Sequence, residues 1–407
     1  MTHGYHRYPA KFIPQIVHRL INEYTEIGDT VLDPFGGCGT TLVEAKILGR
    51  KSIGFDINPI AKLITQTKIT PIKPVTLNNA LKKFNKIHSN LTAKRAEHHQ
   101  RIDYWFEEKN IAELDRIYSA IQQLGNNNVR RFFLCSFSHN LKNCSRWLMK
   151  SIKPTLDKNK SIPEPLPLFL RHLSMMMRRN EQFYMALNDV NNMDVPAQML
   201  RRNAAKKWRL PSNSIDLIVT SPPYVTSYEY ADLHQLSLLW FGDDPKRFKK
   251  WNRFSEDFDN FRKTFVGTSI KRRRHRKGLQ STLADNIINK LLDLDVSEAR
   301  SRAVDVGHYY QDMGRTFQEM YRVLRPGAKA CIIIGNTRIH GVDILNAEVA
   351  AEQMCQLGFH PVEFVKREIT NKMIAPWRDT ETGKFTDLHN PDKQRAYEYE
   401  YVLVMQK

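Results

Sequence analysis

The chain is poor in cysteine, and it has no long apolar run. Its 407 residues include five cysteines, an odd number without a CxxC pair, at positions 38, 135, 144, 331 and 355. This usage is typical of a reducing compartment and offers neither a disulfide framework nor a zinc site, so we expect no bound metal. No apolar stretch approaches the roughly 18 residues that cross a bilayer, and the first residues carry no apolar export signal. We therefore expect a cytoplasmic protein without membrane association.

Acidic residues are also scarce. The 43 Asp and Glu are outnumbered by 62 Lys and Arg, which gives a formal net charge of +19. Such a surplus favours a polyanionic partner, because each cation placed on a phosphate releases condensed counterions. The alternative is a charged, solvated surface, as in ribosomal or membrane-surface proteins. The length suits one large α/β domain with a sizeable insertion, or two domains.

The first part of the chain, residues 1–75, alternates between helix and strand patterns. Apolar spacing predicts a helix over 12–24, a strand over 30–33, a helix over 40–48 and a strand over 52–56. This alternation implies a parallel sheet with right-handed crossovers.

The middle part, residues 76–205, has a different composition. It is rich in Lys, Arg, Asn and Gln, and its apolar residues recur at helical spacing over 111–124 and 129–147. Three prolines between 163 and 167 are expected to interrupt the helices. We predict a mainly helical insertion.

The α/β pattern returns in the last part, residues 206–407, which also contains a polar, basic loop over 245–300. The predicted elements are a strand over 214–219, a helix over 309–324, a turn over 325–327, a strand over 330–334, a helix over 347–357, and an antiparallel pair formed by 361–367 and 399–405.

A glycine-rich loop follows the first predicted strand. Residues 33–41 read Asp-Pro-Phe-Gly-Gly-Cys-Gly-Thr-Thr, and Asp56 ends the next strand. Glycines let the backbone approach a ligand, a helix N-terminus presents free N–H groups, and an acid at the second strand end can bind ribose hydroxyls. The loop suits any adenosine-containing cofactor; the alternative is a plain strand-to-helix turn. Asp33 as an acceptor for an ammonium group, and the lack of a full GxGxxG spacing, favour S-adenosylmethionine over a nicotinamide dinucleotide.

A Ser-Pro-Pro-Tyr string, residues 221–224, follows the strand predicted over 214–219. The two prolines fix φ and remove two donors, so the Ser221 hydroxyl and the Pro222 carbonyl can both accept protons from one exocyclic amine. Tyr224 offers a flat face on which an extruded base could stack. The alternative is a Pro-Pro loop with an incidental aromatic residue.

Together the two strings resemble motifs I and IV of the DNA methylase N-4/N-6 family. The resemblance implies a Rossmann-like class I methyltransferase fold with a mostly parallel seven-stranded sheet, S-adenosylmethionine as cofactor and double-stranded DNA as partner, with a cognate restriction endonuclease as a possible second partner. Family members with Ser first in motif IV are mostly cytosine-N4 enzymes, so cytosine N4 is the favoured target. Cytosine C5 chemistry would need a Pro-Cys dipeptide, which the sequence lacks. The alternatives are adenine-N6 methylation, RNA amino-methylation, and nucleic-acid binding without catalysis.

The resemblance also assigns residues to roles. Tyr8-Pro9-Ala10-Lys11-Phe12 resembles motif X, which in the family packs against the methionine end of the cofactor. The catalytic residues implied are Ser221, Pro222, Pro223 and Tyr224. The cofactor contacts implied are Lys11, Phe12, Asp33, Pro34, Phe35, Gly36, Gly39, Thr40, Thr41, Asp56 and Ile57. Candidates for the target pocket are Tyr228, Tyr230, Asp232 and Trp240, although helix or core packing is the favoured alternative for each. Asn203 is a weak candidate for the adenine contact.

Phosphate contacts are expected from a basic run of six cations in seven residues; the alternative is a solvated run of charges. These cations are Lys271, Arg272, Arg273, Arg274, Arg276 and Lys277. A second basic face on the insertion is interleaved with Trp147 and comprises Arg130, Arg131, Arg146, Lys150 and Lys153. The order of motifs resembles the class in which a DNA-recognition region lies between the cofactor and catalytic motifs, so residues 76–205 are the candidate recognition region. Catalysis requires that the 221–224 corner lie beside the 33–39 turn.

Overall fold

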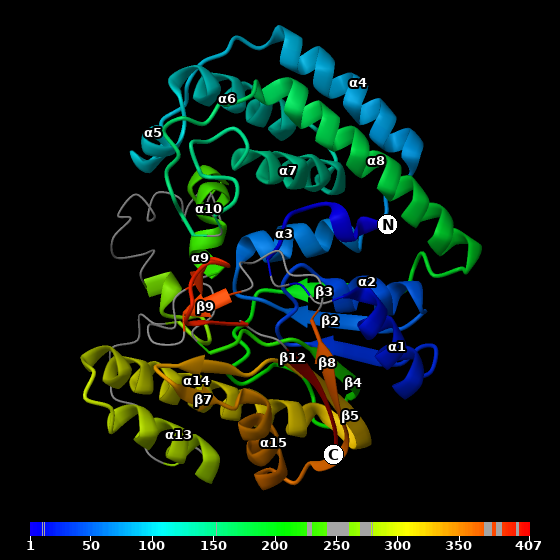
Figure 1. The fold of residues 1–407 in the computed structure, drawn as a ribbon. Helices are drawn as coiled ribbons and strands as arrows, with labels where there is room; N and C mark the ends of the chain where they lie inside the picture. Colours follow the sequence, from blue (N-terminus) through cyan, green and yellow to red (C-terminus); the bar gives the residue numbers. More distant parts are fainter. Residues whose placement is uncertain are drawn as a thin grey trace. The chain divides into compact units, whose positions relative to one another are not determined.

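A computed structural model describes most of the chain (Figure 1). The described residues are 1–9, 11, 13–151, 153–225, 230–241, 260–268, 278, 280–369, 377–379, 385–395 and 399–407. The chain divides into two compact units. Unit 1 comprises Met1–Ile16, Gly36–Arg201 and Glu229–Phe261, and unit 2 comprises Val17–Phe35, Arg202–Tyr228 and Arg262–Lys407.

The central sheet has seven strands in the order β3-β2-β1-β4-β5-β12-β8. Their bounds are β1 Thr30–Asp33, β2 Lys51–Phe55, β3 Ala197–Leu200, β4 Ile215–Thr220, β5 Leu324–Ile334, β8 His360–Glu368 and β12 Tyr399–Gln406. Within unit 1, β2 and β3 are parallel; within unit 2, β1, β4 and β5 are parallel, and β12 runs antiparallel to β5 and β8. The predicted fold class, a mostly parallel seven-stranded α/β sheet, is confirmed.

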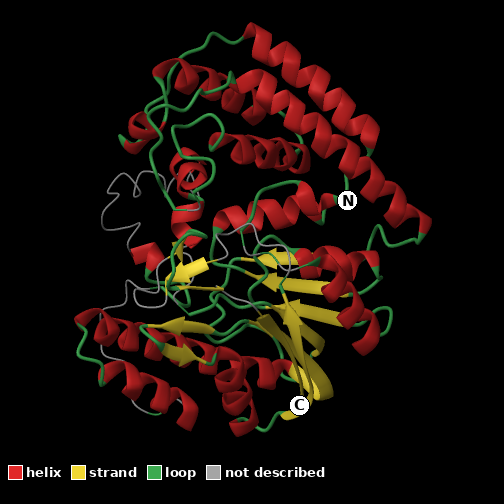
Figure 2. Ribbon diagram, viewed as in Figure 1, coloured by secondary structure: helices red, strands yellow, loops and turns green. Residues whose placement is uncertain are grey.

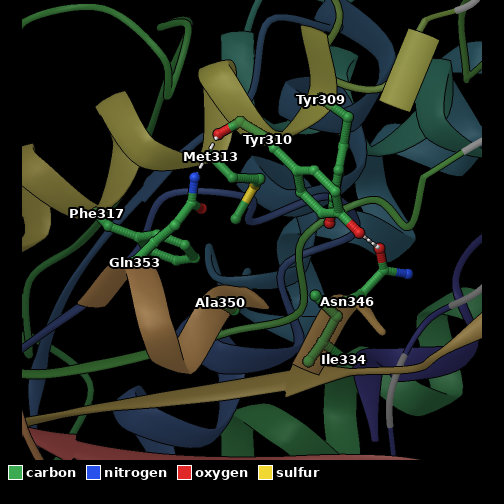
Figure 3. A pocket seen from close by; sticks show the side chains of 8 residues that line it. All are labelled: Tyr309, Tyr310, Met313, Phe317, Ile334, Asn346, Ala350 and Gln353. Carbon is green, nitrogen blue, oxygen red and sulfur yellow. Dashed lines mark hydrogen bonds between the residues drawn. The ribbon is translucent and has the colours of Figure 1, made fainter. Parts of the chain in front are cut away.

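Unit 2 packs helices against its strands through apolar side chains. These helices are α13 Thr282–Leu292, α14 Ser297–Val323 and α15 Asn346–Gln356, and α1 Pro14–Tyr24 lies mostly in this unit. Figure 3 shows side chains of α14, α15 and β5 meeting around Met313 and Phe317, and the space among them does not admit a water molecule. The crevice is therefore a packed core and not a ligand site.

Two details of unit 2 differ from the sequence prediction. Helix α14 begins at Ser297, well before the predicted residue 309, because Ala299, Ala303 and Val306 extend the buried face. The predicted turn at 325–327 is wrong, since these residues belong to β5. These residues instead coincide with an irregularity in the pairing of β4 with β5: Ile215 pairs with Leu324, but Leu217 pairs with Lys329.

Unit 1 contains the helices predicted for residues 76–205 (Figure 2), but the prediction that this stretch does not continue the sheet is wrong, because it also holds β3, which pairs with β2. Its helices are α4 Pro74–Asn90, α5 Arg101–Trp105, α6 Glu108–Gln122, α7 Asn127–Leu141 and α8 Pro165–Asp189; the unit also holds η1 Thr2–Gly4, α2 Thr40–Ile47, α3 Pro59–Lys68, α9 Tyr230–Leu233 and α10 Gln235–Phe241. The prolines at 165 and 167 do not interrupt a helix, because they occupy the first turn of α8, where no N–H is needed. Helix α7 ends at Leu141, six residues before the predicted end.

Short strands complete unit 2. Strands β6 Thr337–Ile339 and β7 Val342–Ile344 form one antiparallel pair, and β9 Trp377–Asp379 pairs with both β10 Phe385–Thr386 and β11 Lys393–Arg395. Among the described helices, none has the length and apolar character needed to span a bilayer.

Candidate active site

The carboxyl ends of three parallel strands of unit 2 lie at one edge of the sheet. Strand β4 lies between β1 and β5, so the residues that follow the three strands leave the sheet side by side. Asp33 ends β1 and is 1% exposed. Its Oδ1 accepts hydrogen bonds from the Thr220 hydroxyl at 2.7 Å and from the Phe35 N–H at 3.1 Å. The acid before the glycine loop and the threonine before Ser-Pro-Pro-Tyr are thus directly bonded.

The Ser-Pro-Pro-Tyr corner begins directly at the end of β4. Pro222 is buried, whereas Ser221, Pro223 and Tyr224 are half-buried. The ring of Tyr224 lies against Gly335, the first residue after β5: a Cβ built on Gly335 would be 2.9 Å from Cε2 of the tyrosine. The missing side chain at 335 therefore makes room for the ring.

Asn346 holds Gly335 in place. Its Nδ2 donates to the Gly335 carbonyl at 2.9 Å, and its Oδ1 accepts from the Tyr310 hydroxyl at 3.3 Å. Asn346 is 1% exposed, and the close-up in Figure 3 shows the tyrosine-to-asparagine bond. Neither Gly335 nor Asn346 was predicted from the sequence, where the local signal is a Gly-Asn pair after an apolar strand.

The glycine loop continues in unit 1. The Gly36 N–H donates to the Phe55 carbonyl at 2.9 Å, and Gly39, at φ +78°, is the N-cap of α2. No acceptor in the described part of the chain reaches the backbone N–H of Gly37, Cys38 or Thr40. Unpaired N–H groups that lie close together at a helix N-terminus suit an anion or a polar ligand.

The predicted ribose-binding acid has a fixed position after β2. Asp56 is half-buried, and its Oδ1 accepts from the Asn58 N–H at 2.8 Å; Ile57, between them, is also half-buried. Asn58 caps α3 by accepting from the Ile60 N–H at 2.9 Å, and its side-chain amide bonds Nδ1 of His234 at 2.9 Å. The turn that carries Asp56 is therefore anchored to the start of α3.

The motif X segment is partly described. Tyr8 covers the glycine loop, since a Cβ on Gly37 would be 3.3 Å from its ring, and it stacks on Tyr230 with ring centroids 6.3 Å apart. Lys11 is exposed, and its ammonium donates to the His3 carbonyl at 3.3 Å. Phe12 lies outside the described residues.

The residues expected around the target base have different environments. Trp240 is 3% exposed and packs against Phe106 and Phe137, with ring centroids 5.2 and 5.7 Å away, so it belongs to the helical core. Asp232 on α9 is half-buried. Asn203 donates to the Thr264 carbonyl at 2.9 Å. Tyr228 lies outside the described residues.

Three buried histidines, His6, His172 and His234, and the half-buried His139 lie together where the N-terminal segment meets α7, α8 and the start of α10, and sequence reasoning missed them. His6 bonds the Ser138 hydroxyl at 3.0 Å, His172 bonds the Ser136 hydroxyl at 2.9 Å, and the rings of His139 and His172 stack at 3.8 Å. Burial lowers the pKa of His6 to about 4 and that of His172 to about 3, and the pKa of His234 likewise falls to about 3. At neutral pH these imidazoles are uncharged and structural. The described residues contain no group of metal-binding side chains.

Of the two predicted basic surfaces, the structure describes the one on the insertion. Residues Lys271 to Lys277 lie outside the described part of the chain. Of the second basic face, Lys150 and Lys153 are exposed. Trp147, expected among these cations as a possible nucleic-acid contact, is 2% exposed and stacks on Trp105 at 5.3 Å. It is a core residue.

The mostly parallel sheet, with an acid and glycine loop at one strand end and a rigid Ser-Pro-Pro-Tyr corner at the next, defines a Rossmann-like methyltransferase. A family model described as DNA methylase matches residues 2–67. The chain is 25% identical to Type II methyltransferase M.MvaI from Kocuria varians, over 94% of this chain and 87% of that one, and 26% identical to Type II methyltransferase M.BsoBI from Geobacillus stearothermophilus, over 89% and 79%. A solved structure of a SAM-dependent methyltransferase from Methanosarcina mazei aligns over 99% of this chain and 98% of that one, with 10% identity and a TM-score of 0.32. The family model and these relatives support the N4/N6 family of DNA methylases for this chain.

Proposed function

We propose that this DNA methylase transfers a methyl group from S-adenosylmethionine to the exocyclic N4 of a cytosine extruded from double-stranded DNA at a specific sequence. The observation that carries the proposal is the 2.7 Å hydrogen bond between Thr220 and Asp33, which joins the residue before Ser-Pro-Pro-Tyr to the residue that opens the glycine loop. The similarity to Type II methyltransferases supports a defined DNA site and a cognate restriction endonuclease.

The residues present fit the cofactor. The unpaired N–H groups of Gly37, Cys38 and Thr40 suit its carboxylate, the carboxylate of Asp33 suits its ammonium group, and that of Asp56 suits its ribose hydroxyls. By resemblance to motifs I and X, the remaining contacts come from Lys11, Phe12, Pro34, Phe35, Gly36, Gly39, Thr41 and Ile57. When bound, S-adenosylmethionine supplies a sulfonium methyl group that an amine can accept without an enzyme thiol.

The target amine would be oriented by two acceptors of the Ser-Pro-Pro-Tyr corner. The Ser221 hydroxyl and the Pro222 carbonyl would accept the two N–H bonds of the amine, which leaves its lone pair free to attack. Neither Pro222 nor Pro223 has an N–H that could occupy these acceptors. Tyr224, whose ring is seated against Gly335, would stack on the extruded base. Ser in the first position favours cytosine N4 over adenine N6.

The remaining segments are assigned to DNA. We propose that residues 76–205 read the target sequence and that the cations of 271–277 contact phosphates, because a net charge of +19 suits a polyanionic duplex. The division of the catalytic part into residues 1–75 and 206–407 belongs to the same proposal.

Labelled-methyl transfer to duplex DNA and to RNA, followed by mass spectrometry of the nucleosides, tests the substrate and the base. We expect N4-methylcytosine in DNA. Adenine-N6 methylation or transfer to RNA alone would contradict the proposal.

Ser221→Ala should lower turnover by about 100-fold with nearly unchanged cofactor affinity, the scale expected for lost positioning. Asp56→Ala should weaken cofactor binding first; if both variants turn over normally, the site assignment is wrong.

A further inference from the structure

Helix α3 packs beneath the glycine loop and sends two buried side chains to its carbonyl groups. The Thr65 hydroxyl donates to the Gly37 carbonyl at 2.8 Å, and the Lys68 ammonium donates to the Cys38 carbonyl at 2.7 Å. Thr65 is fully buried and Lys68 is 1% exposed. The two residues are three positions apart on one helical face, so both reach the same loop.

The Thr65 bond orients the loop. The peptide bonds of the described chain are trans, so the N–H of each peptide unit points opposite to its carbonyl. Because the Gly37 carbonyl points toward α3, the Cys38 N–H of the same peptide unit points away from α3. A Cβ on Gly39 would lie 2.4 Å from Cγ2 of Thr65, which shows how closely the helix supports the loop.

Lys68 forms no ion pair with a carboxylate within the described part of the chain. Glu44, a buried acid on α2, bonds His3 at 2.6 Å instead. Burial, and to a smaller extent the charge of Lys68, lowers the pKa of His6. A buried cation normally requires a paired anion.

We propose that Lys68 is a positioning residue that recognises the carboxylate of the cofactor through the glycine loop, with Thr65 fixing the loop's shape. This inference rests on the proposed use of S-adenosylmethionine. The ammonium holds the Cys38 carbonyl and places one positive charge behind N–H groups that have no partner in the described chain. The ligand's only anionic group supplies a counterion.

Calorimetric titration with S-adenosylmethionine and with its decarboxylated analogue tests the inference without any turnover. Lys68→Gln keeps a donor but removes the charge. It should weaken S-adenosylmethionine by about tenfold to thirtyfold, the scale of a unit-charge interaction in an effective dielectric near 20. The analogue, which lacks the carboxylate, should change by less than about twofold. Lys68→Arg should restore the affinity for S-adenosylmethionine.

Thr65→Val is the matched control, because it removes a loop bond without removing charge. It should weaken S-adenosylmethionine less than Lys68→Gln does, because it disturbs the loop without removing a charge. Equal losses of the two ligands in Lys68→Gln would make Lys68 a structural clamp and overturn the inference, as would unchanged binding of S-adenosylmethionine. If Lys68→Gln does not fold, Lys68→Arg decides: an arginine variant that folds but binds the two ligands equally well overturns the inference. If the wild-type protein binds neither ligand, the proposed cofactor itself is wrong.

Discussion

Gly335→Ala is a small change with a large predicted effect on methyl transfer. The new methyl carbon would lie 2.9 Å from Cε2 and 3.3 Å from Cζ of the Tyr224 ring. Carbon atoms pack at about 3.5–4.0 Å, so the ring must move by about 0.5–1 Å. A displacement of that size at a stacking surface lowers turnover by up to roughly 100-fold, while overpacking costs about 1–3 kcal/mol of stability. Asp33, Gly39 and Asp56 are unchanged, so cofactor affinity should hold.

The assay is single-turnover methyl transfer at saturating DNA and cofactor, with cofactor affinity measured by calorimetry on the same preparation. Gly125→Ala is the matched control, because a Cβ there meets nothing within 4 Å. Tyr224→Ala sets the scale of losing the ring. If Gly335→Ala turns over within twofold of wild type while Tyr224→Ala is impaired, the ring does not work from the position against residue 335, and the reasoning fails.

Two further predictions concern pH and salt. His172 has a pKa of about 3 in the folded chain, below the unfolded value near 6.5, so the unfolded chain alone takes up this proton as the pH falls. The free energy of unfolding should therefore decrease below pH 6.5, and urea melts should show His172→Gln losing about 2 kcal/mol less than wild type between pH 7 and 5; an equal loss would contradict a neutral buried His172. Replacing the six cations of 271–277 by Gln should lower the slope of log affinity for DNA against log salt, and an unchanged slope would remove this run from the interface.

Most of the sheet could be predicted from local patterns. Strands such as 30–33 and 215–220 are short and apolar, and turn-forming residues follow them. The apolar pattern and these residues therefore predict the same strand. Predictions failed where one residue type is compatible with two kinds of local structure. Pro165 starts a helix instead of interrupting one, and Pro326-Gly327 forms an irregularity inside β5 instead of a turn. Which structure forms depends on the strand or helix that packs against these residues, and the local sequence does not contain that information.

The candidate site was predictable only where its residues form strings. Asp33 and Ser221 belong to contiguous motifs, whereas Gly335, Asn346 and His172 owe their positions to contacts with residues distant in the chain. A lone glycine after a strand has no distinctive sequence signature. Trp147 illustrates the converse error, because its neighbours in the sequence are cations but its neighbours in space are core residues.

Thr220 explains why the two motifs can be separated by almost two hundred residues and still act together. Its hydroxyl is buried and donates a hydrogen bond to Asp33. This bond holds the ends of β1 and β4 at one spacing, whatever is inserted between them in the sequence. The helices of residues 74–189 leave the sheet after β2 and the chain returns at β3, so these helices can change without altering that spacing. Residues 221, 224 and 335 should therefore govern turnover, and residues 56, 65 and 68 should govern cofactor affinity. A variant of the insertion that alters the DNA sequence preference should leave both quantities unchanged on its new site.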